Sequence, residues 1–187
     1  VDVIKSTDFL AYPITLYIYN ETETIPNCIN EQSFELTINA TPVIKDLLDI
    51  DGVCDVYKLP SLEGLNLSGN EAYYTGPNGS GMQYQAGDVL SYTDFTSYPV
   101  TLYVYDAVGV TTNLCSDEVS FELTINATPD ITDLLDVAGV CDTYELPLIL
   151  GTNLTGNEAY YTEANGLGTQ YKTGDICPLE RKNKSSF

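Results

Sequence analysis

The sequence predicts an all-β protein built from tandem β-sandwich modules, and three observations lead to this fold class. A set of short segments occurs twice, with a period of about 87 residues. Apolar and polar residues alternate within the longer segments, as they do in half-buried strands. Clusters of Gly, Pro and Asn separate the segments at the spacing of turns in a sandwich.

The repeat is read directly from matching segments. SFELTINATP occupies residues 33–42 and again 120–129, which is 87 residues later. YPITLYIY at 12–19 returns as YPVTLYVY at 98–105 with an offset of 86, because the loop before Cys115 is one residue longer than the loop before Cys28. The other matching pairs are GNEAYYT at 69–75 and 156–162, GVCD at 52–55 and 139–142, and DLLD at 46–49 and 133–136. A period of this length fits a small, independently folded bead.

Each copy is expected to consist of strands. Residues 100–104 and 121–125 alternate apolar with polar side chains, and a polar loop containing Gly109 and Cys115 joins them into a hairpin. Shorter strands are expected at 56–59, 72–75, 82–85 and 89–92, with a turn at 76–81. Only 44–50 and 131–137 have the pattern of a helical turn.

The ends of the chain do not coincide with the expected ends of a module. SFELTINATP is typical of a last strand followed by a proline-containing linker. We therefore expect residues 1–41 to be the closing hairpin of a preceding module, 42–127 a complete module, and 128–176 the opening part of the next. A permuted alternative counts units from Asp2 and from Asp88. Residues 177–187 match nothing in the first copy and form a non-repeat tail.

Composition excludes several classes of function. The formal net charge is −20, and such an acidic surface repels phosphates, so nucleic acid is excluded as a partner. The chain has no His, the commonest general base at neutral pH, and we expect it not to be an enzyme. It also has no apolar run of 18 residues, so no membrane-spanning segment is expected.

The order of these motifs resembles a known family. GVCD-x-Y-x-LP, GNEAYYTG, GDVL, YPVTLYVY and CSDE-x-SFELTINATP follow one another along the chain. This order resembles the Ig-like repeats of large surface adhesins of gliding Bacteroidota, of the SprB type, which are exported by the type IX secretion system. The resemblance covers residues 1–176. It implies Ig-like modules in an extracellular filament or adhesin associated with the outer membrane, with neighbouring modules as partners.

The cysteines recur with the repeat, since Cys28 matches Cys115 and Cys54 matches Cys141. Recurrence favours one disulfide per module in an oxidising compartment. One pairing, which the family resemblance also favours, joins Cys54 to Cys115 and would contribute about 4 kcal/mol by the loop-entropy model. The other joins Cys28 to Cys54 and Cys115 to Cys141. Cys177 has no counterpart, because Leu90 stands at its position in the first copy.

A calcium site is a further hypothesis. Asp46, Asp49, Asp51 and Asp55 cluster around Gly52 and supply the hard oxygen ligands that calcium prefers. Asp51 becomes Ala138 in the second copy, and no bidentate Glu follows at the spacing of a calcium loop. A solvated acidic segment is therefore the favoured interpretation, with calcium-stiffened linkers kept as an alternative and no other cofactor expected.

Tyrosines provide a candidate ligand-binding face. Tyr17, Tyr19, Tyr103 and Tyr105 are expected on the strand face opposite the aliphatic residues, where they would stack on surface polysaccharide. Tyrosines in such positions also stabilise cross-strand pairs without any ligand, and we favour that role. The function expected overall is a structural or adhesive one at the cell surface, with attachment or gliding as its context. A Tyr-dependent carbohydrate-binding module is the alternative.

Overall fold

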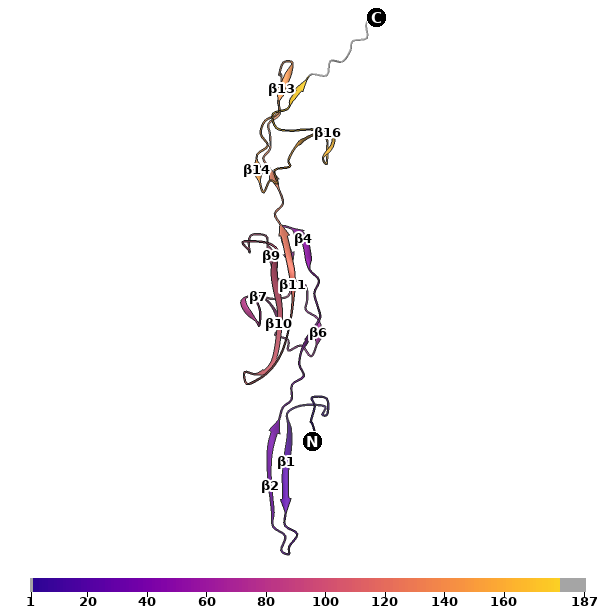
Figure 1. Ribbon diagram of the computed structural model, residues 1–187, viewed down its shortest axis with the longest axis vertical. Helices are drawn as coiled ribbons and strands as arrows, with labels where there is room; N and C mark the ends of the chain where they lie inside the picture. Colours follow the sequence, from indigo (N-terminus) through magenta and orange to yellow (C-terminus); the bar gives the residue numbers. More distant parts are fainter. Residues whose placement is uncertain (1, 179–187) are drawn as a thin grey trace. The chain divides into compact units, whose positions relative to one another are not determined.

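The computed structural model describes residues 2–178, which form β-strands and turns and no helix (Figure 1). The all-β fold class is thus confirmed. The chain divides into two compact units, residues 1–125 and residues 126 onward. The described part of the chain holds no helix of the length and apolarity that a membrane span requires.

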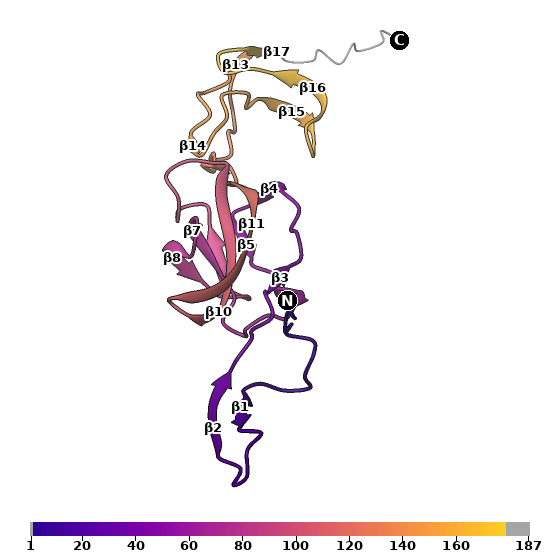
Figure 2. The same ribbon diagram turned by 60° about the horizontal axis from the view of Figure 1, so that its bottom comes forward.

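The first unit begins with a two-stranded hairpin. Strands β1 (Ile14–Glu21) and β2 (Ile29–Leu36) pair antiparallel, with Leu16 opposite Phe34. These two strands form a sheet of their own, and neither has another strand beside it (Figures 1 and 2). The hairpin corresponds to the segment expected to close a preceding module.

A five-stranded sheet forms the main body of the first unit. Its strand order is β4-β11-β10-β7-β8. Strands β10 (Val100–Val110) and β11 (Asn113–Asn126) make its long central hairpin, with Leu102 opposite Phe121. The remaining strands are β4 (Ile50–Cys54), β7 (Ala72–Gly76) and β8 (Ser80–Tyr84).

Two short strand pairs complete the first unit. Strand β3 (Val43–Ile44) pairs with β6 (Gly64–Leu65), and β5 (Val56–Lys58) pairs with β9 (Val89–Ser91). Residues of these segments and of the five-stranded sheet share one hydrophobic core: Ile44, Leu59, Tyr73, Leu90, Leu102, Val104, Phe121, Leu123 and Ile125. The core members of β10 and β11 occupy alternate positions, which is the periodicity seen in the sequence.

The structure corrects two local expectations. The stretch 44–50, expected as a helical turn, is extended, and its counterpart 131–137 contains no helix either. The central hairpin is longer than predicted: β10 continues to Val110 and β11 begins at Asn113, so Gly109 and Cys115 lie in strands and not in a loop. Extended pairing satisfies the backbone N–H and C=O groups that a polar loop would leave to water.

Residues 44–49 run in the same direction as β11. The amide of Ile44 donates to Asp117 Oδ2 at 2.7 Å, and the amide of Glu122 donates to Asp49 Oδ1 at 2.7 Å. Both contacts join residues 73 positions apart, so the two segments advance together along the module. Because of this parallel course, Ile44 lies beside Asp117 of β11. Strand β4, which follows Asp49, lies beside the C-terminal end of β11.

The second unit repeats the strand pairs of residues 43–91 in the first unit. Strand β12 (Asp130–Ile131) pairs with β14 (Gly151–Thr152), β13 (Thr143–Glu145) with β17 (Ile176–Pro178), and β15 (Tyr160–Glu163) with β16 (Leu167–Tyr171). The registers agree with those of the first unit: Ile131 lies opposite Gly151 as Ile44 lies opposite Gly64, and Tyr160 lies opposite Tyr171 as Tyr73 lies opposite Tyr84.

The expected module boundaries stay a prediction, and the two compact units relate to them by position only. The division before Asn126 lies close to the expected end of the complete module at residue 127, whereas residues 1–41 belong to the same unit as the module that follows them. The repeat pattern also extends past residue 176, because Tyr144 faces Cys177 as Tyr57 faces Leu90. The remainder of the expected tail, from residue 179 onward, lies outside the described residues.

Candidate interaction surface

The core of the complete module is formed by two halves of the chain. The opening half, residues 42–91, contributes Ile44, Leu59, Tyr73 and Leu90. The closing hairpin, β10 and β11, contributes its five buried members, including Val104 and Phe121. The rings of Tyr73 and Phe121 meet edge to face, with their centroids 6.2 Å apart. Each half therefore buries the apolar face of the other.

Polar contacts fix how the two halves meet. Asp106, on β10, is 1% exposed, and its carboxylate accepts from the Ser68 amide at 2.8 Å, from the Ser68 hydroxyl and from the Ala107 amide. The amide of Asn78, in the β7–β8 turn, donates to Glu118 on β11. Together with the contacts of Asp49 and Asp117, these bonds satisfy backbone groups at the junction, as buried polar groups require.

The hairpin β1–β2 has the same sequence pattern as β10–β11, but within residues 2–178 no second sheet covers its inward face. Ile18 is 62% exposed, whereas its counterpart Val104 is fully buried. Phe34 is 47% exposed, whereas its counterpart Phe121 is 3% exposed. The inward face of this hairpin is thus a core face left open to solvent, and contiguous apolar surface of this kind is typical of an interaction site.

The second unit presents the converse surface. Ile131 is 57% exposed, whereas its counterpart Ile44 is 5% exposed. Tyr160 and Leu146 are half-buried, whereas Tyr73 and Leu59 are buried. This unit keeps the local structure of the complete copy: the hydroxyl of Tyr160 donates to the Pro147 carbonyl at 2.9 Å, as Tyr73 does to Pro60 at 3.0 Å. Its described residues, as far as Pro178, include no counterpart of β10 and β11.

The cysteines are not joined by disulfides in this structure. Cys28, Cys54 and Cys141 are exposed, and Cys115 and Cys177 are half-buried. Because residues 44–49 and β11 run in parallel, Cys54 follows Asp49 at one end of the module, and Cys115 precedes Asp117 at the other. Twelve residues of extended chain separate the two positions, or about 40 Å at about 3.3 Å per residue.

The pairing of Cys54 with Cys115 stays a prediction, and in this structure the two residues lie far apart. A disulfide requires Cα atoms within about 7 Å of each other. In the conformation described, a single module does not bring these two cysteines within that distance. The recurrence of Cys28 as Cys115 and of Cys54 as Cys141 still needs an explanation, and within one module the structure offers none.

The four candidate calcium ligands are not gathered into a site. Asp46, Asp49 and Asp51 are exposed, and Asp55 is half-buried at a positive φ of 61°. The Asp49 carboxylate accepts a hydrogen bond from the Glu122 amide, so it is bound to the backbone of β11. Within residues 2–178, no group of three or more His, Cys, Asp or Glu side chains has the arrangement of a metal site.

The candidate tyrosine face differs between the two copies. Tyr103 and Tyr105 alternate with the buried residues of β10, so they lie on its outer face as predicted, but both are half-buried. Tyr105 packs edge to face on Tyr74, with centroids 6.3 Å apart. It also covers the β7–β8 turn, since a Cβ added at Gly79 would lie 2.9 Å from Tyr105 Cδ1. These contacts give Tyr105 a structural role.

On the hairpin β1–β2 the equivalent tyrosines lack that packing. Tyr17 and Tyr19 are 65% and 52% exposed, and Tyr19 donates its hydroxyl to Glu21 Oε2 at 2.6 Å. Their exposure follows from the missing β7–β8 hairpin, which in the complete module covers Tyr105. It is therefore not by itself the sign of a sugar-binding platform.

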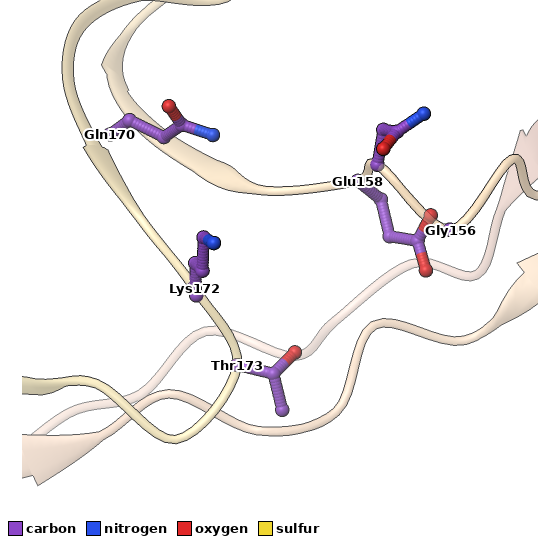
Figure 3. Close-up of a pocket in the computed structure, with 6 residues that line it drawn as sticks. Gly156, Glu158, Gln170, Lys172 and Thr173 are labelled. Carbon is purple, nitrogen blue, oxygen red and sulfur yellow. The ribbon is translucent and has the colours of Figure 1, made fainter.

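A polar hollow lies beyond the end of the β15–β16 hairpin. Its volume is about 460 Å³, and its lining includes Glu158, Gln170, Lys172 and Thr173 (Figure 3). One carboxylate oxygen of Glu158 is buried without a hydrogen-bond partner in the described structure. In the complete module the counterpart, Glu71, accepts the Gly69 amide at 2.9 Å. The hollow has no aromatic wall and belongs to the half-module that lacks its hairpin.

Burial at the junction changes tyrosine titration. Desolvation, followed by the proximity of Tyr57, raises the pKa of Tyr73 to about 12. Burial also raises the pKa of Tyr98, with a further contribution from Asp94. The hydroxyl of Tyr98 donates to the Ser91 carbonyl at 3.1 Å, and its ring packs on Phe95. These groups stabilise the module in their neutral forms.

Sequence reasoning missed the most informative surface. The exposed faces of the hairpin β1–β2 and of the second unit correspond to core faces of the complete module. Their signal was present in the apolar positions Ile18, Phe34 and Ile131, which match core positions of the complete copy. The buried acceptor Asp106 was also missed, since Asn20 stands at its position in the first copy.

Comparison with known proteins adds no family assignment: no protein-family model, curated protein or solved structure matches this chain.

Proposed function

We propose that this chain is part of an array of Ig-like β-sandwich modules that serves a structural or adhesive role in an extracellular filament or surface adhesin. The observation that carries the proposal is the repetition of one folding unit along the chain. The same registers and several of the same hydrogen bonds occur in both copies of the opening half, and the same hairpin register occurs in both copies of the closing half.

The surface chemistry supports a role without catalysis. Many of the acidic side chains are occupied in holding the backbone. Asp8, Asp88, Asp94 and Asp175 each accept the amide of the residue three positions earlier, at 2.6–2.7 Å. Such carboxylates stabilise turns and are poorly placed for acid–base chemistry. The high negative charge keeps a long array soluble and discourages association through polar surfaces.

The resemblance to SprB-type repeats supplies the proposed location. An outer-membrane-associated filament on the cell surface, acting in attachment or gliding, fits an acidic array of β modules. Neighbouring modules of the same protein are the partners that the two uncovered core faces fit best. A Tyr-dependent carbohydrate-binding module and a calcium-stiffened stalk remain the competing proposals, and no contact in the described residues favours either.

Immunolabelling of intact source cells tests the location. Antibodies raised against the 187-residue chain are expected to label the surface of unpermeabilised cells, and brief protease treatment of those cells should remove the label. Labelling that requires permeabilisation would reject an extracellular array.

A glycan array separates the structural proposal from the carbohydrate-binding one. We expect no specific binding by the wild-type chain, and the same result for the double variant Tyr17→Ala/Tyr19→Ala. Specific binding that this variant loses would favour the carbohydrate-binding module instead.

A further inference from the structure

The hairpin β1–β2 and residues 128–178 match the two complementary halves of the complete module. We propose that the hairpin β1–β2 of one copy docks on residues 128–178 of a second copy and completes a module in trans. This inference goes beyond the proposed function, because it concerns self-association and requires no assumption about location or adhesive target. In a longer array, adjoining repeats would cover the same two faces.

The apolar faces match position by position. In the complete module, Val104 and Phe121 of the hairpin bury Ile44 and Tyr73 of the opening half. The docking hairpin supplies Ile18 and Phe34 at the first two positions, and the second unit supplies Ile131 and Tyr160 at the others. The apolar character of every one of these core positions is therefore retained.

The backbone edges match as well. Strand β10 pairs antiparallel with β7, with Val104 opposite Tyr73 and Tyr105 opposite Ala72. Within the described residues, β1 has only β2 beside it, and β15 has only β16. Pairing β1 with β15 would place Ile18 opposite Tyr160 and Tyr19 opposite Ala159. It would fill the unpaired edges of both strands, in the manner of β-strand addition.

The polar contacts at the junction also have counterparts. The bond from Asn78 to Glu118 becomes one from Asn165 to Glu31, and both residue types are kept. Asn165 already has the same left-handed conformation, with φ of 61° against 57° for Asn78. The bond from Glu122 to Asp49 becomes one from Glu35 to Asp136, again with both residues kept.

Two contacts have changed counterparts but remain complementary. Asp117, which accepts the Ile44 amide, becomes Asn30, whose side-chain oxygen can still accept that bond from Ile131. Ser68 and the buried Asp106 become Thr155 and Asn20. A hydroxyl and a side-chain oxygen are still available, so the hydrogen bond can form without a buried carboxylate.

The docking segment begins at about residue 6. Residues 3–5 correspond to β9 (Val89–Ser91), and in the second unit β17 already occupies that place, with Cys177 opposite Tyr144. Within the docking segment, the rings of Phe9 and Tyr12 pack against each other with their centroids 6.0 Å apart. The rings of Phe95 and Tyr98 in the complete module do the same. In the complete module Phe95 also lies against Tyr84, so Phe9 would meet Tyr171 of the second copy.

Each copy carries one face of each kind, which makes the contact heterologous. Such contacts produce head-to-tail chains or rings and not a symmetric dimer that stops at two subunits. Light scattering after size exclusion, under reducing conditions, should therefore show multiples of the 20.5 kDa chain that grow with concentration. A wild-type chain that stays at 20.5 kDa over the whole concentration range would overturn the proposal.

A complementation experiment tests the two faces separately. Ile18→Asp/Phe34→Asp blocks the hairpin, and Ile131→Asp blocks the opening half, because a carboxylate would be buried unpaired in the completed core. Each variant alone is expected to be monomeric. An equimolar mixture should give a dimer of twice the chain mass that grows no further, since only one pair of intact faces remains.

Two matched controls carry the same charge change away from the core face. Thr15 corresponds to the exposed Thr101, and Thr132 corresponds to the exposed Lys45, so Thr15→Asp and Thr132→Asp should assemble like the wild type. The complete module reports folding in every variant through its near-ultraviolet tyrosine signal. Self-association that persists in a blocked variant, or a mixture that stays monomeric, would show that these two faces do not pair.

Discussion

At the scale of single residues, Tyr73 links the two halves of the module. Its ring is buried against Phe121 of the closing hairpin, while its hydroxyl donates to Pro60 of the opening half. An aromatic ring with a satisfied hydroxyl contributes both apolar burial and a hydrogen bond. The same burial makes the ionised form unfavourable and raises the pKa to about 12.

This shift predicts a loss of stability at alkaline pH. The pKa of Tyr73 in the folded state lies above the value of about 10 expected when unfolded. The unfolded chain therefore loses the proton first as pH rises. The contribution is complete below pH 10 and is lost between about pH 10 and 12, by about 3 kcal/mol in total.

Urea unfolding of Tyr73→Phe across this pH range measures the effect. At pH 7 the free energy of unfolding of the variant should be about 1 kcal/mol lower than that of the wild type, because the hydrogen bond to the Pro60 carbonyl is lost. Above pH 10, the stability of the variant should fall less steeply with pH than that of the wild type. Some pH dependence should remain, because the pKa values of Tyr57, Tyr84 and Tyr98 are raised too. Tyr17→Phe, at an exposed position, is the control. Equal slopes for Tyr73→Phe and the wild type would refute this assignment.

Aspartates show why residue type alone did not predict their role. Asp49 has the side chain of a calcium ligand and lies in an acidic segment, but it accepts an amide of β11, which is 73 residues away in sequence. Asp106 is buried and accepts two bonds from Ser68. Only the fold brings these donors to the carboxylates.

At the scale of elements, the parallel course of residues 44–49 and β11 decides how far apart Cys54 and Cys115 lie. The sequence predicted that a disulfide would connect the start of the module to its last hairpin. The structure also places the start of the module against that hairpin, but with Cys54 and Cys115 at opposite ends of it. Proximity of two elements is thus not enough, because their direction determines which residues meet.

Peptide mapping under non-reducing conditions tests this arrangement. We expect no peptide linked between Cys54 and Cys115 in the folded monomer. Cys54→Ser/Cys115→Ser should retain the unfolding free energy of the wild type within about 1 kcal/mol, whereas loss of a real disulfide would cost about 2–5 kcal/mol. Finding the linked peptide in the monomer would show that the direction of residues 44–49 is wrong.

Turns show the opposite behaviour, since local sequence specifies them in both copies. Asn66 and Asn153 have positive φ values of 54° and 55°, and their side chains donate to Thr41 and Thr128 at 3.2 and 3.3 Å. Thr75 and Thr162 each accept the amide seven residues later at 2.9 Å. These contacts form whether or not the closing hairpin is present.

At the scale of the whole molecule, charge dominates. The formal net charge is −20, and within residues 2–178 the sole ion pair joins the exposed Lys45 and Glu63 at 2.6 Å. An exposed pair of this kind contributes little to stability. Repulsion among the carboxylates therefore destabilises the folded chain at low ionic strength, and screening by salt relieves it.

Thermal unfolding in different salts tests both the repulsion and the calcium hypothesis. The Tm should rise with NaCl, and at equal ionic strength CaCl₂ and MgCl₂ should give equal shifts. Asp51→Ala introduces the residue that the second copy carries as Ala138, and it should respond to both ions as the wild type does. A larger shift with calcium that Asp51→Ala abolishes would restore the calcium site.

The sequence by itself determined the strands, the turns and the repeat, since period-two alternation and turn residues act over short distances. Residues 100–104 and 121–125 were predicted correctly as a hairpin, and so was the strand at 72–75. Local pattern misjudged 44–50, because its extended form depends on backbone contacts with Asp117 and Glu122, far along the chain.

The tertiary structure decided which faces are covered. Ile18 and Val104 have the same pattern around them, yet one is exposed and the other buried. Burial depends on whether the opposing half of the module is present, and a strand does not encode that in its own residues. The separation of Cys54 from Cys115 and the burial of Asp106 have the same origin: each is fixed by the direction and register of strands distant in sequence, which alternation does not specify.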